Sequence, residues 1–195
     1  MLEVRRKIVH ACGVFVILLI VWLVKWNAAL ITLLIALVGL VFAEYRKNRN
    51  KYKIIKSKKL DEFDELVENG FKEYERPNTL PFKGAIEFFM GCFFAIVLFE
   101  PLISMAAIAV LSLADALSTL IGSYYGSHKL PINRNKSFEG SSAFFITAFF
   151  VLLFFIDPFK AIIIAIFATI AEMIPKIDDN LIVPITVGIV MTIIS

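Results

Sequence analysis

Long apolar runs separated by short charged segments constrain the fold of this chain more than any other feature. Seven runs approach the roughly 20 apolar residues that a membrane-crossing helix needs. They cover 8–24, 27–43, 85–99, 101–122, 141–156, 159–175 and 181–195. Of the 195 residues, 59% are hydrophobic, which exceeds the share of about half in soluble globular proteins. We therefore expect one all-α integral membrane domain over 1–195 with about seven transmembrane helices.

Polar residues next to proline separate several of these runs. Glu100-Pro101 and Asp157-Pro158 each stand between two apolar runs, and Pro175 begins another break. Proline disfavours helical backbone at the residue before it. These positions therefore predict tight turns between antiparallel helices.

The distribution of lysine and arginine predicts the orientation of the chain in the membrane. Of the 20 basic residues, 18 fall in the segments 1–7, 44–84, 123–140 and 176–180, which alternate with the apolar runs. Positively charged loops stay on the cytoplasmic side. We therefore predict a cytoplasmic N-terminus and an external C-terminus. No convincing cleavage site follows the basic start, so we expect an uncleaved first helix.

The long loop at 44–84 changes its charge along its length. Its residues 46–59 carry eight basic residues, and residues 61–75 carry seven acidic ones. Apolar residues recur at helical spacing in the second part, which is typical of an amphipathic helix lying on the inner leaflet. For the basic part, a plain cytoplasmic loop that obeys the positive-inside rule is the favoured explanation.

In this orientation, ionisable residues in or beside the runs gather on the cytoplasmic side. Ionisable groups within a membrane are costly and usually functional. The sequence therefore predicts an active site at the cytoplasmic interface. The residues gathered there are Glu3, Arg6, Lys7, His10, Glu87, Asp115, Lys136, Glu172, Asp178 and Asp179.

The acids of this group are suited to magnesium. Asp115, Glu172, Asp178 and Asp179 offer hard oxygen ligands for Mg²⁺, which itself binds phosphates. Ion pairs with the nearby basic residues are the alternative, and one or two of these acids are expected to have that structural role. Acids, bases and glycines together are what phosphoryl or nucleotidyl transfer requires.

Small residues around Asp115 and at the start of the fifth run predict phosphate binding. On a helix, Asp115, Gly122 and Gly126 share one face, so a ligand or another helix can approach closely. Ser137, Gly140 and Ser141 stand where a helix N-terminus would present N–H groups to phosphate. The alternatives are helix packing for the glycines and a helix cap for Ser137. A Walker A loop is absent from the sequence.

Four motifs in order resemble the CTP-dependent lipid-alcohol kinases, the family of dolichol kinase and phytol kinase. The first is Glu3-x-x-Arg6-Lys7-x-x-His10, and a weaker one is Lys83-Gly84 through Gly91. The most specific is Asp115-x6-Gly122-x3-Gly126 followed by Lys136-Ser137-x-Glu139-Gly140-Ser141. The last is Glu172 followed by Asp178-Asp179-Asn180-x3-Pro184.

The resemblance implies transfer of the γ-phosphate of CTP to a membrane alcohol, dolichol or a shorter polyprenol, with Mg²⁺ at the cytoplasmic face. It implies Asp115, Asp178 and Asp179 as metal ligands. It implies a catalytic set of Asp115, Asp178, Asp179, Glu172 and His10. It implies that the nucleotide phosphates contact Arg6, Lys7, Gly122, Gly126, Lys136, Ser137, Glu139, Gly140, Ser141 and Asn180. We expect no nucleic-acid partner and leave a homodimer open.

Two other functions compete with this prediction. A CDP-lipid synthase would release pyrophosphate and need a lipid phosphate. The sequence has no segment that resembles the C-terminal signature of that family. A transporter would place its charged residues near the midplane and towards both membrane faces. The one-sided distribution of charged residues argues against a transporter.

Overall fold

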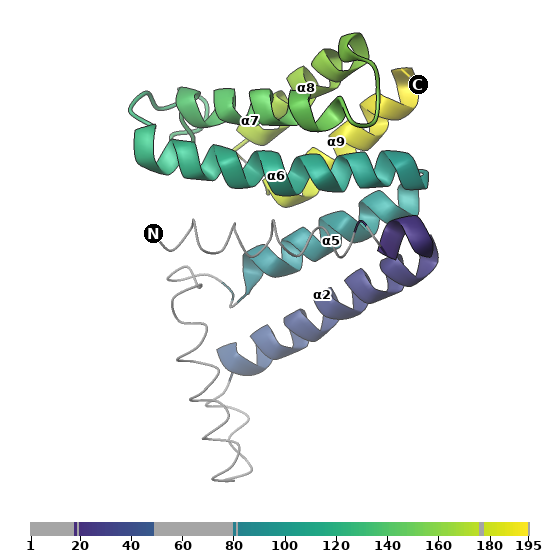
Figure 1. The fold of residues 1–195 in the computed structure, drawn as a ribbon. Helices are drawn as coiled ribbons and strands as arrows, with labels where there is room; N and C mark the ends of the chain where they lie inside the picture. The colour runs from purple at the N-terminus through teal and green to yellow at the C-terminus, as the bar shows by residue number, and fades with distance from the viewer. Residues whose placement is uncertain (1–17, 19, 49–79, 81, 176–177, 195) are drawn as a thin grey trace.

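The computed structural model describes residues 18, 20–48, 80, 82–175 and 178–194. Regular structure in these residues is helical, apart from a single antiparallel bridge between Lys129 and Ser137. The predicted all-α fold is therefore confirmed for the described part of the chain. Its helices are α2 (Lys25–Lys47), α5 (Lys83–Leu98), α6 (Pro101–Tyr125), α7 (Phe138–Leu152), α8 (Pro158–Met173) and α9 (Asp179–Ile194) (Figure 1).

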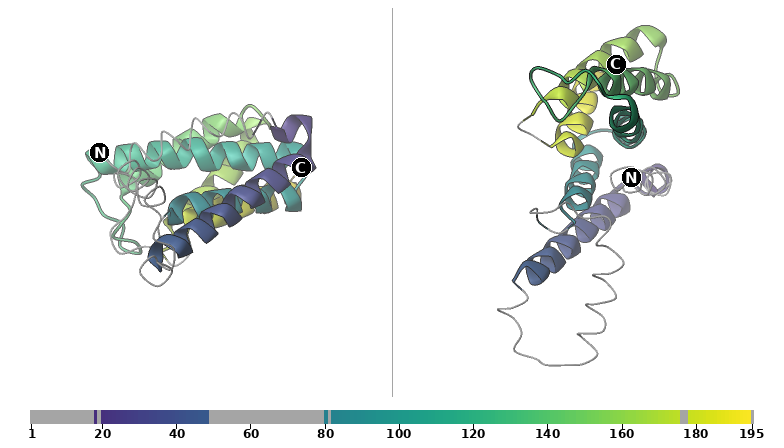
Figure 2. Two further views of the ribbon diagram at one scale, coloured as in Figure 1. Left: turned by 90° about the horizontal axis from the view of Figure 1, so that it is seen from below. Right: turned by 90° about the vertical axis from the view of Figure 1, so that its left-hand side faces the viewer.

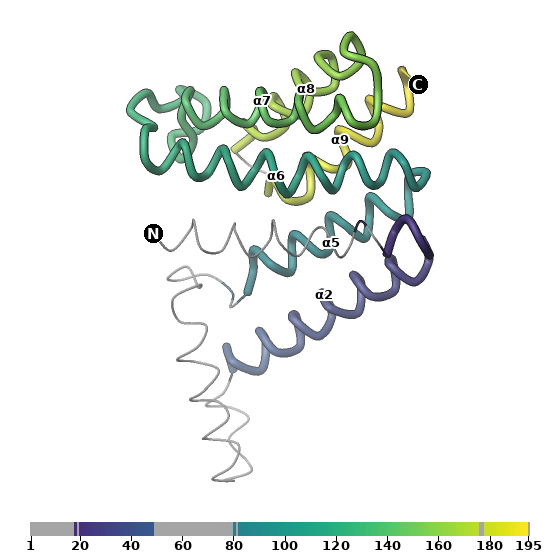
Figure 3. Tube along the Cα trace, in the orientation of Figure 1, coloured from purple at the N-terminus to yellow at the C-terminus, as the bar shows by residue number. Residues whose placement is uncertain are grey.

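The long helix α6 is the centre of the arrangement. Helices α7 and α9 pack against it, and α8 packs against both α7 and α9. Helix α5 contacts α9 and α6, and α2 packs on α5, so that α2 lies farthest from α8 (Figure 2). The Cα trace shows the same order without the helix ribbons (Figure 3). Consecutive helices run in opposite directions. The end of each helix and the start of the next one therefore lie at the same end of the bundle.

Small side chains form much of the interior. Close approach of helix backbones is how membrane helices gain van der Waals contact, because burial away from lipid brings no hydrophobic gain. Small residues are buried in each of the six described helices, and Gly188 is the one in α9. The fully or almost fully buried alanines include Ala36, Ala43, Ala95, Ala106, Ala107, Ala114, Ala148, Ala161, Ala165 and Ala168.

The two proline breaks confirm the predicted turns. Pro101 is the first residue of α6, and the preceding Glu100 is extended. Pro158 begins α8 in the same way, where the Asp157 carboxylate accepts a hydrogen bond from the Lys160 N–H at 3.1 Å. Proline suits the first helical position because its missing N–H would have no helical partner there.

The described part of the chain contains two helices that are long and apolar enough to cross a membrane, α2 and α6. Helices α5, α7, α8 and α9 have 15 or 16 residues, which is about 24 Å at the helical rise. The hydrocarbon core is about 30 Å thick, so the seven-span topology and its orientation stay predictions. Large apolar side chains of α2, including Leu30, Leu34 and Val41, are exposed. This exposure supports a membrane protein.

Two predicted helices fall largely or wholly outside the described residues. They are most of the first span, 8–24, and the amphipathic helix at 61–75. The remaining predicted spans agree with α2 and α5–α9 to within a few residues.

Gly91 allows the closest approach between α5 and α9. A Cβ atom added at Gly91 would lie 2.0 Å from the Asn180 backbone oxygen and 3.3 Å from Pro184. Backbone cannot move aside as a side chain can. Contact between α5 and the start of α9 therefore requires glycine at this position.

We predict that Gly91→Ala destabilises the protein by about 1–3 kcal/mol, the usual cost of overpacking a well-packed interior. Thermal unfolding of the detergent-solubilised protein measures the effect. Gly39→Ala on α2 is the matched control, because its new methyl group would meet only the Ile86 side chain, at 3.1 Å. Equal melting temperatures for the two variants would contradict the prediction.

Candidate active site

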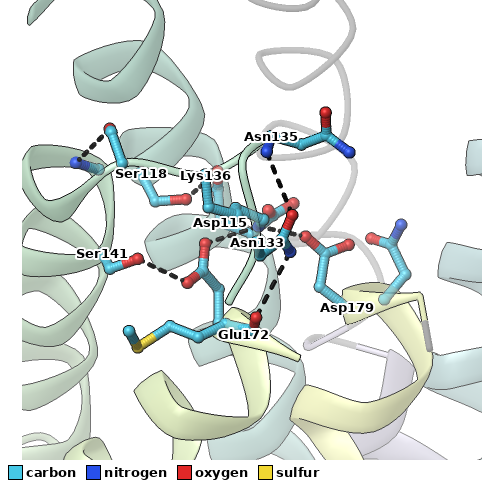
Figure 4. A network of polar contacts seen from close by, with 12 residues as sticks. Asp115, Ser118, Asn133, Asn135, Lys136, Ser141, Glu172 and Asp179 are labelled. Atoms are coloured by element: carbon cyan, nitrogen blue, oxygen red, sulfur yellow. Dashed lines mark hydrogen bonds and ion pairs between the residues drawn. The ribbon is translucent and has the colours of Figure 1, made fainter. Parts of the chain in front are cut away.

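Lys136 joins three segments that are far apart in the sequence. It precedes α7 in the α6–α7 loop, and its Nζ lies 2.6 Å from Glu172 Oε1 near the end of α8. The same Nζ lies 2.7 Å from Asp179 Oδ2 at the start of α9. Ser141 of α7 donates a hydrogen bond to the other Glu172 oxygen at 2.9 Å. Figure 4 shows these side chains turned towards one another.

This cluster is charged and largely enclosed. The Glu172 side chain is fully buried, and the side chains of Lys136 and Asp179 are 23% and 20% exposed. Burial alone lowers the pKa of Lys136, but the negative charges of Asp179 and Glu172 outweigh it and hold the pKa above its usual value. The ammonium group therefore stays protonated at physiological pH. With both acids ionised, the three groups carry one net negative charge.

Ser137 caps α7 from a space that three glycines leave open. Its Oγ accepts a hydrogen bond from the Gly140 N–H at 3.1 Å. An added Cβ would lie 2.6 Å from this Oγ at Gly126, 3.2 Å at Gly140 and 3.3 Å at Gly122. The glycines of the central motif thus allow α7 to begin directly against α6. The cap and packing alternatives are both realised here, and nucleotide contact by Gly122 and Gly126 stays a prediction.

Backbone N–H groups at the start of α7 already have acceptors. Phe138 donates to the His128 carbonyl at 2.9 Å, and Ser141 donates to the Ser137 carbonyl at 2.9 Å. The Gly140 N–H is bonded to the cap described above. A phosphate at this helix end would have to replace such bonds. Basic side chains are therefore better suited to hold phosphate here than the backbone of Gly140 and Ser141.

A cavity of about 880 Å³ opens beside the Lys136 cluster. Residues from α5, α6, α7, α8, α9 and the α6–α7 loop line it, so the antiparallel helices bring their polar ends together here. Its charged lining residues are Lys83, Glu87, Lys129, Lys136, Glu172, Asp178 and Asp179.

Two lysines of the cavity wall are absent from the predicted set of phosphate-binding residues. Lys83 begins α5, where it forms a 3.4 Å ion pair with Glu87, one helical turn later. Lys129 follows α6 in the loop that leads to α7. Lys83 is the first residue of the weak Lys83–Gly91 motif, and this is the sequence signal that identifies it. For Lys129, the sequence offers only its place in a basic loop.

The start of α9 presents oxygen donors to this cavity. Asp178 Oδ1 accepts hydrogen bonds from the Asn180 backbone N–H at 3.0 Å and from its side-chain amide at 2.8 Å. The buried side-chain oxygen of Asn180 accepts no hydrogen bond within the described residues. Among those residues, no group of three or more His, Cys, Asp or Glu side chains forms a metal cage. The donors suit Mg²⁺ shared between one or two carboxylates and a ligand's phosphates.

Asp115 lies deeper in α6 than the cavity wall. It is buried, and the residues that line the cavity from α6 begin at Ser118, one turn later. Figure 4 shows it beside Lys136 and Asn133, and the Ser118 hydroxyl donates a hydrogen bond to its backbone carbonyl at 3.2 Å. Its roles as metal ligand and catalytic acid stay predictions.

Three predicted site residues, Arg6, Lys7 and His10, lie outside the described residues. The other predicted residues occupy α6, the α6–α7 loop and the adjoining ends of α7, α8 and α9. Asn133 was missed by the sequence analysis. It is buried in the loop, and its side-chain oxygen accepts a hydrogen bond from the Asn135 N–H at 3.2 Å.

Chloroplastic phytol kinases are among the known proteins that this chain is similar to. The chain is 29% identical to the probable chloroplastic phytol kinase of Zea mays over 147 residues, 65% of this chain and 48% of that one. It is 28% identical to the chloroplastic phytol kinase 1 of Arabidopsis thaliana over 123 residues, 53% and 40% of the two chains. The chain is a relative of the phytol kinases. The family resemblance of its motifs is thereby confirmed.

The chain spans about half the length of the curated phytol kinases that it matches. It also matches an uncharacterized protein of Rickettsia prowazekii, with 27% identity over 194 residues, 94% of this chain and 90% of that one. No family model and no solved structure matches the chain.

We predict that Lys136→Met lowers the stability of this protein more than Glu172→Gln does. Removing the lysine leaves the buried Glu172 charge without its ammonium partner, which costs about 3–5 kcal/mol in a buried pair. The double variant Lys136→Met/Glu172→Gln should recover part of that loss, because the stranded charge is removed too. Thermal unfolding of the four proteins in detergent gives the coupling. Additive losses would show that the pair is energetically unimportant.

Proposed function

We propose that this protein is a membrane kinase that transfers the γ-phosphate of CTP to an isoprenoid alcohol. Dolichol or a shorter polyprenol is the proposed acceptor, Mg²⁺ the cofactor and the cytoplasmic face of the membrane the place of reaction. One observation carries the proposal: a chain related to phytol kinases places its acids and lysines around one cavity at the end of its bundle.

Charge neutralisation is the first task of such a site. Phosphoryl transfer depends mostly on positioning and on stabilising charge, with little covalent chemistry by the protein. Lys83, Lys129 and Lys136 line the cavity and supply positive charge for a triphosphate. Mg²⁺, when bound, would offset phosphate charge with Asp178, Asp179 and the Asn180 oxygen as its protein donors. Arg6 and Lys7 are proposed to add positive charge from the N-terminal segment.

Lys136 and Glu172 are proposed to have different roles in the site. Both oxygens of Glu172 are engaged, one by Lys136 and the other by Ser141. Glu172 is therefore better suited to orient the Lys136 ammonium group than to accept a proton. Lys136 would then face the phosphate that leaves or is transferred. His10 is proposed to orient a phosphate.

The proposed reaction forms one bond and breaks one. The alcohol oxygen attacks the γ-phosphorus, and the bond from that phosphorus to the β–γ bridging oxygen breaks, so that CDP leaves. The alcohol proton passes to a carboxylate, for which Asp115, Asp178 and Asp179 are the candidates. An apolar acceptor reaches the site from within the membrane, which suits a cavity at the end of apolar helices.

The purified protein, given γ-labelled CTP, Mg²⁺ and a panel of phytol, geranylgeraniol and dolichol in detergent, is expected to produce labelled lipid phosphate and CDP. ATP in place of CTP tests the donor. Release of pyrophosphate with a lipid phosphate as acceptor would instead identify a CDP-lipid synthase. Absence of labelled lipid phosphate with every alcohol and nucleotide would overturn the proposal.

We predict that Asp115→Asn lowers kcat at least about 100-fold, the scale on which single catalytic groups act. Initial rates with γ-labelled CTP measure the loss. Asp157→Asn is the matched control, because Asp157 caps α8 through the Lys160 N–H and asparagine caps helices equally well. Full activity of Asp115→Asn would remove Asp115 from the catalytic set.

A further inference from the structure

Glu139 in the first turn of α7 is fully engaged by the residues that follow α6. Its Oε1 accepts a hydrogen bond from the Ser127 hydroxyl at 3.0 Å and lies 2.7 Å from His128 Nδ1. The His128 backbone N–H lies 3.2 Å from Oε1 and 3.3 Å from Oε2. These contacts connect the end of α6 with the start of α7. The hydrogen bond from the His128 ring is the first cause that lowers the pKa of Glu139, to about 2.

This connection closes the base of the loop that carries Lys136. Next to these contacts, the Phe138 N–H donates a hydrogen bond to the His128 carbonyl at 2.9 Å. Lys129 and Ser137 form an antiparallel β-bridge. Farther along, the Leu130 N–H donates to the Lys136 carbonyl at 3.1 Å. The Glu139 carboxylate adds side-chain contacts to the backbone contacts that hold the two ends of this loop together. The position of Lys136 therefore depends on the base of its own loop.

Glu139 does not face the cavity itself. Ser137, Gly140 and Ser141 line the cavity wall, whereas Glu139 is not among the lining residues. Successive residues of a helix point in different directions, about 100° apart. The motif residue between two cavity-lining neighbours thus points towards Ser127 and His128.

We infer that Glu139 is a positioning residue that fixes the 126–137 loop, and with it Lys136, through Ser127 and His128. This differs from the role that the motif resemblance implies, direct contact with the nucleotide. The inference rests on the proposed function for its kinetic consequences but not for the closure itself. A plain alternative is that Glu139 only stabilises α7 by its charge near the helix N-terminus.

Kinetics of single and double variants test the inference. Glu139→Ala and His128→Ala should each raise the KM for CTP by about tenfold, with the KM for the alcohol nearly unchanged, because Lys136 loses its fixed position. The double variant should be no worse than Glu139→Ala alone, since the contact with the His128 ring is already lost when the carboxylate is removed. Additive effects, or a normal KM for His128→Ala, would overturn the inference. Glu100→Gln at the other end of α6 is the control.

Limited proteolysis tests the closure without any activity. Trypsin should cut after Lys129 and Arg134 at least about tenfold faster in Glu139→Ala than in the wild type if the open loop is locally less stable. Ser127→Ala should have the same effect in smaller degree, and Glu100→Gln none. Mass spectrometry identifies the cut sites. Unchanged cleavage in Glu139→Ala would overturn the inference even if the kinase assay succeeds. A failed kinase assay with accelerated cleavage would reject only the proposed function.

Discussion

The ion pairs of Lys136 with Glu172 and Asp179 are the interaction on which the rest of this site depends. A buried carboxylate such as Glu172 is tolerated only with a charged partner and further hydrogen bonds. Lys136 and Ser141 supply these from the loop and from α7. The end of α8 must therefore come against the start of α7, and Asp179 brings the start of α9 to the same point. One ammonium group thus determines how three helix ends meet.

The small residues around Ser137 make this meeting possible. Gly122 and Gly140 face each other across α6 and α7, and the Ser137 hydroxyl occupies the space between them and Gly126. A larger side chain at Gly122 or Gly140 would press α7 away from α6, and one at Gly126 would meet the Gly122 carbonyl and the Ser137 hydroxyl. The central motif therefore combines two requirements, close helix packing and a fixed lysine. The small uncharged residues of the motif thus help to determine where Lys136 lies.

The helices in the described part of this chain were predictable from its sequence, whereas the pairing of its charges was not. Apolar runs bounded by Glu100-Pro101 and Asp157-Pro158 predict α6 and α8 because proline at the first helical position has a local physical cause. The partners of Lys136 depend on where α8 and α9 end in space, and the sequence offers several acids for one lysine. Glu139 shows most clearly what the sequence alone does not predict. Its position in the motif favours contact with a ligand, whereas its geometry favours contact with His128. The orientation of a side chain on a helix, and not the spacing of its motif, decides between the two.

The charge balance of the cavity wall favours a particular kind of ligand. Lys136 is bonded to two carboxylates, so the cluster has a net negative charge and would repel a bare phosphate. A free divalent cation would be attracted to the acids but repelled by Lys83, Lys129 and Lys136. A nucleotide triphosphate with a bound divalent cation presents both signs at once. Its cation can approach Asp178 and Asp179 while its phosphate oxygens approach the lysines. Acids and lysines interleaved along one wall therefore match a cation–phosphate complex better than either component alone.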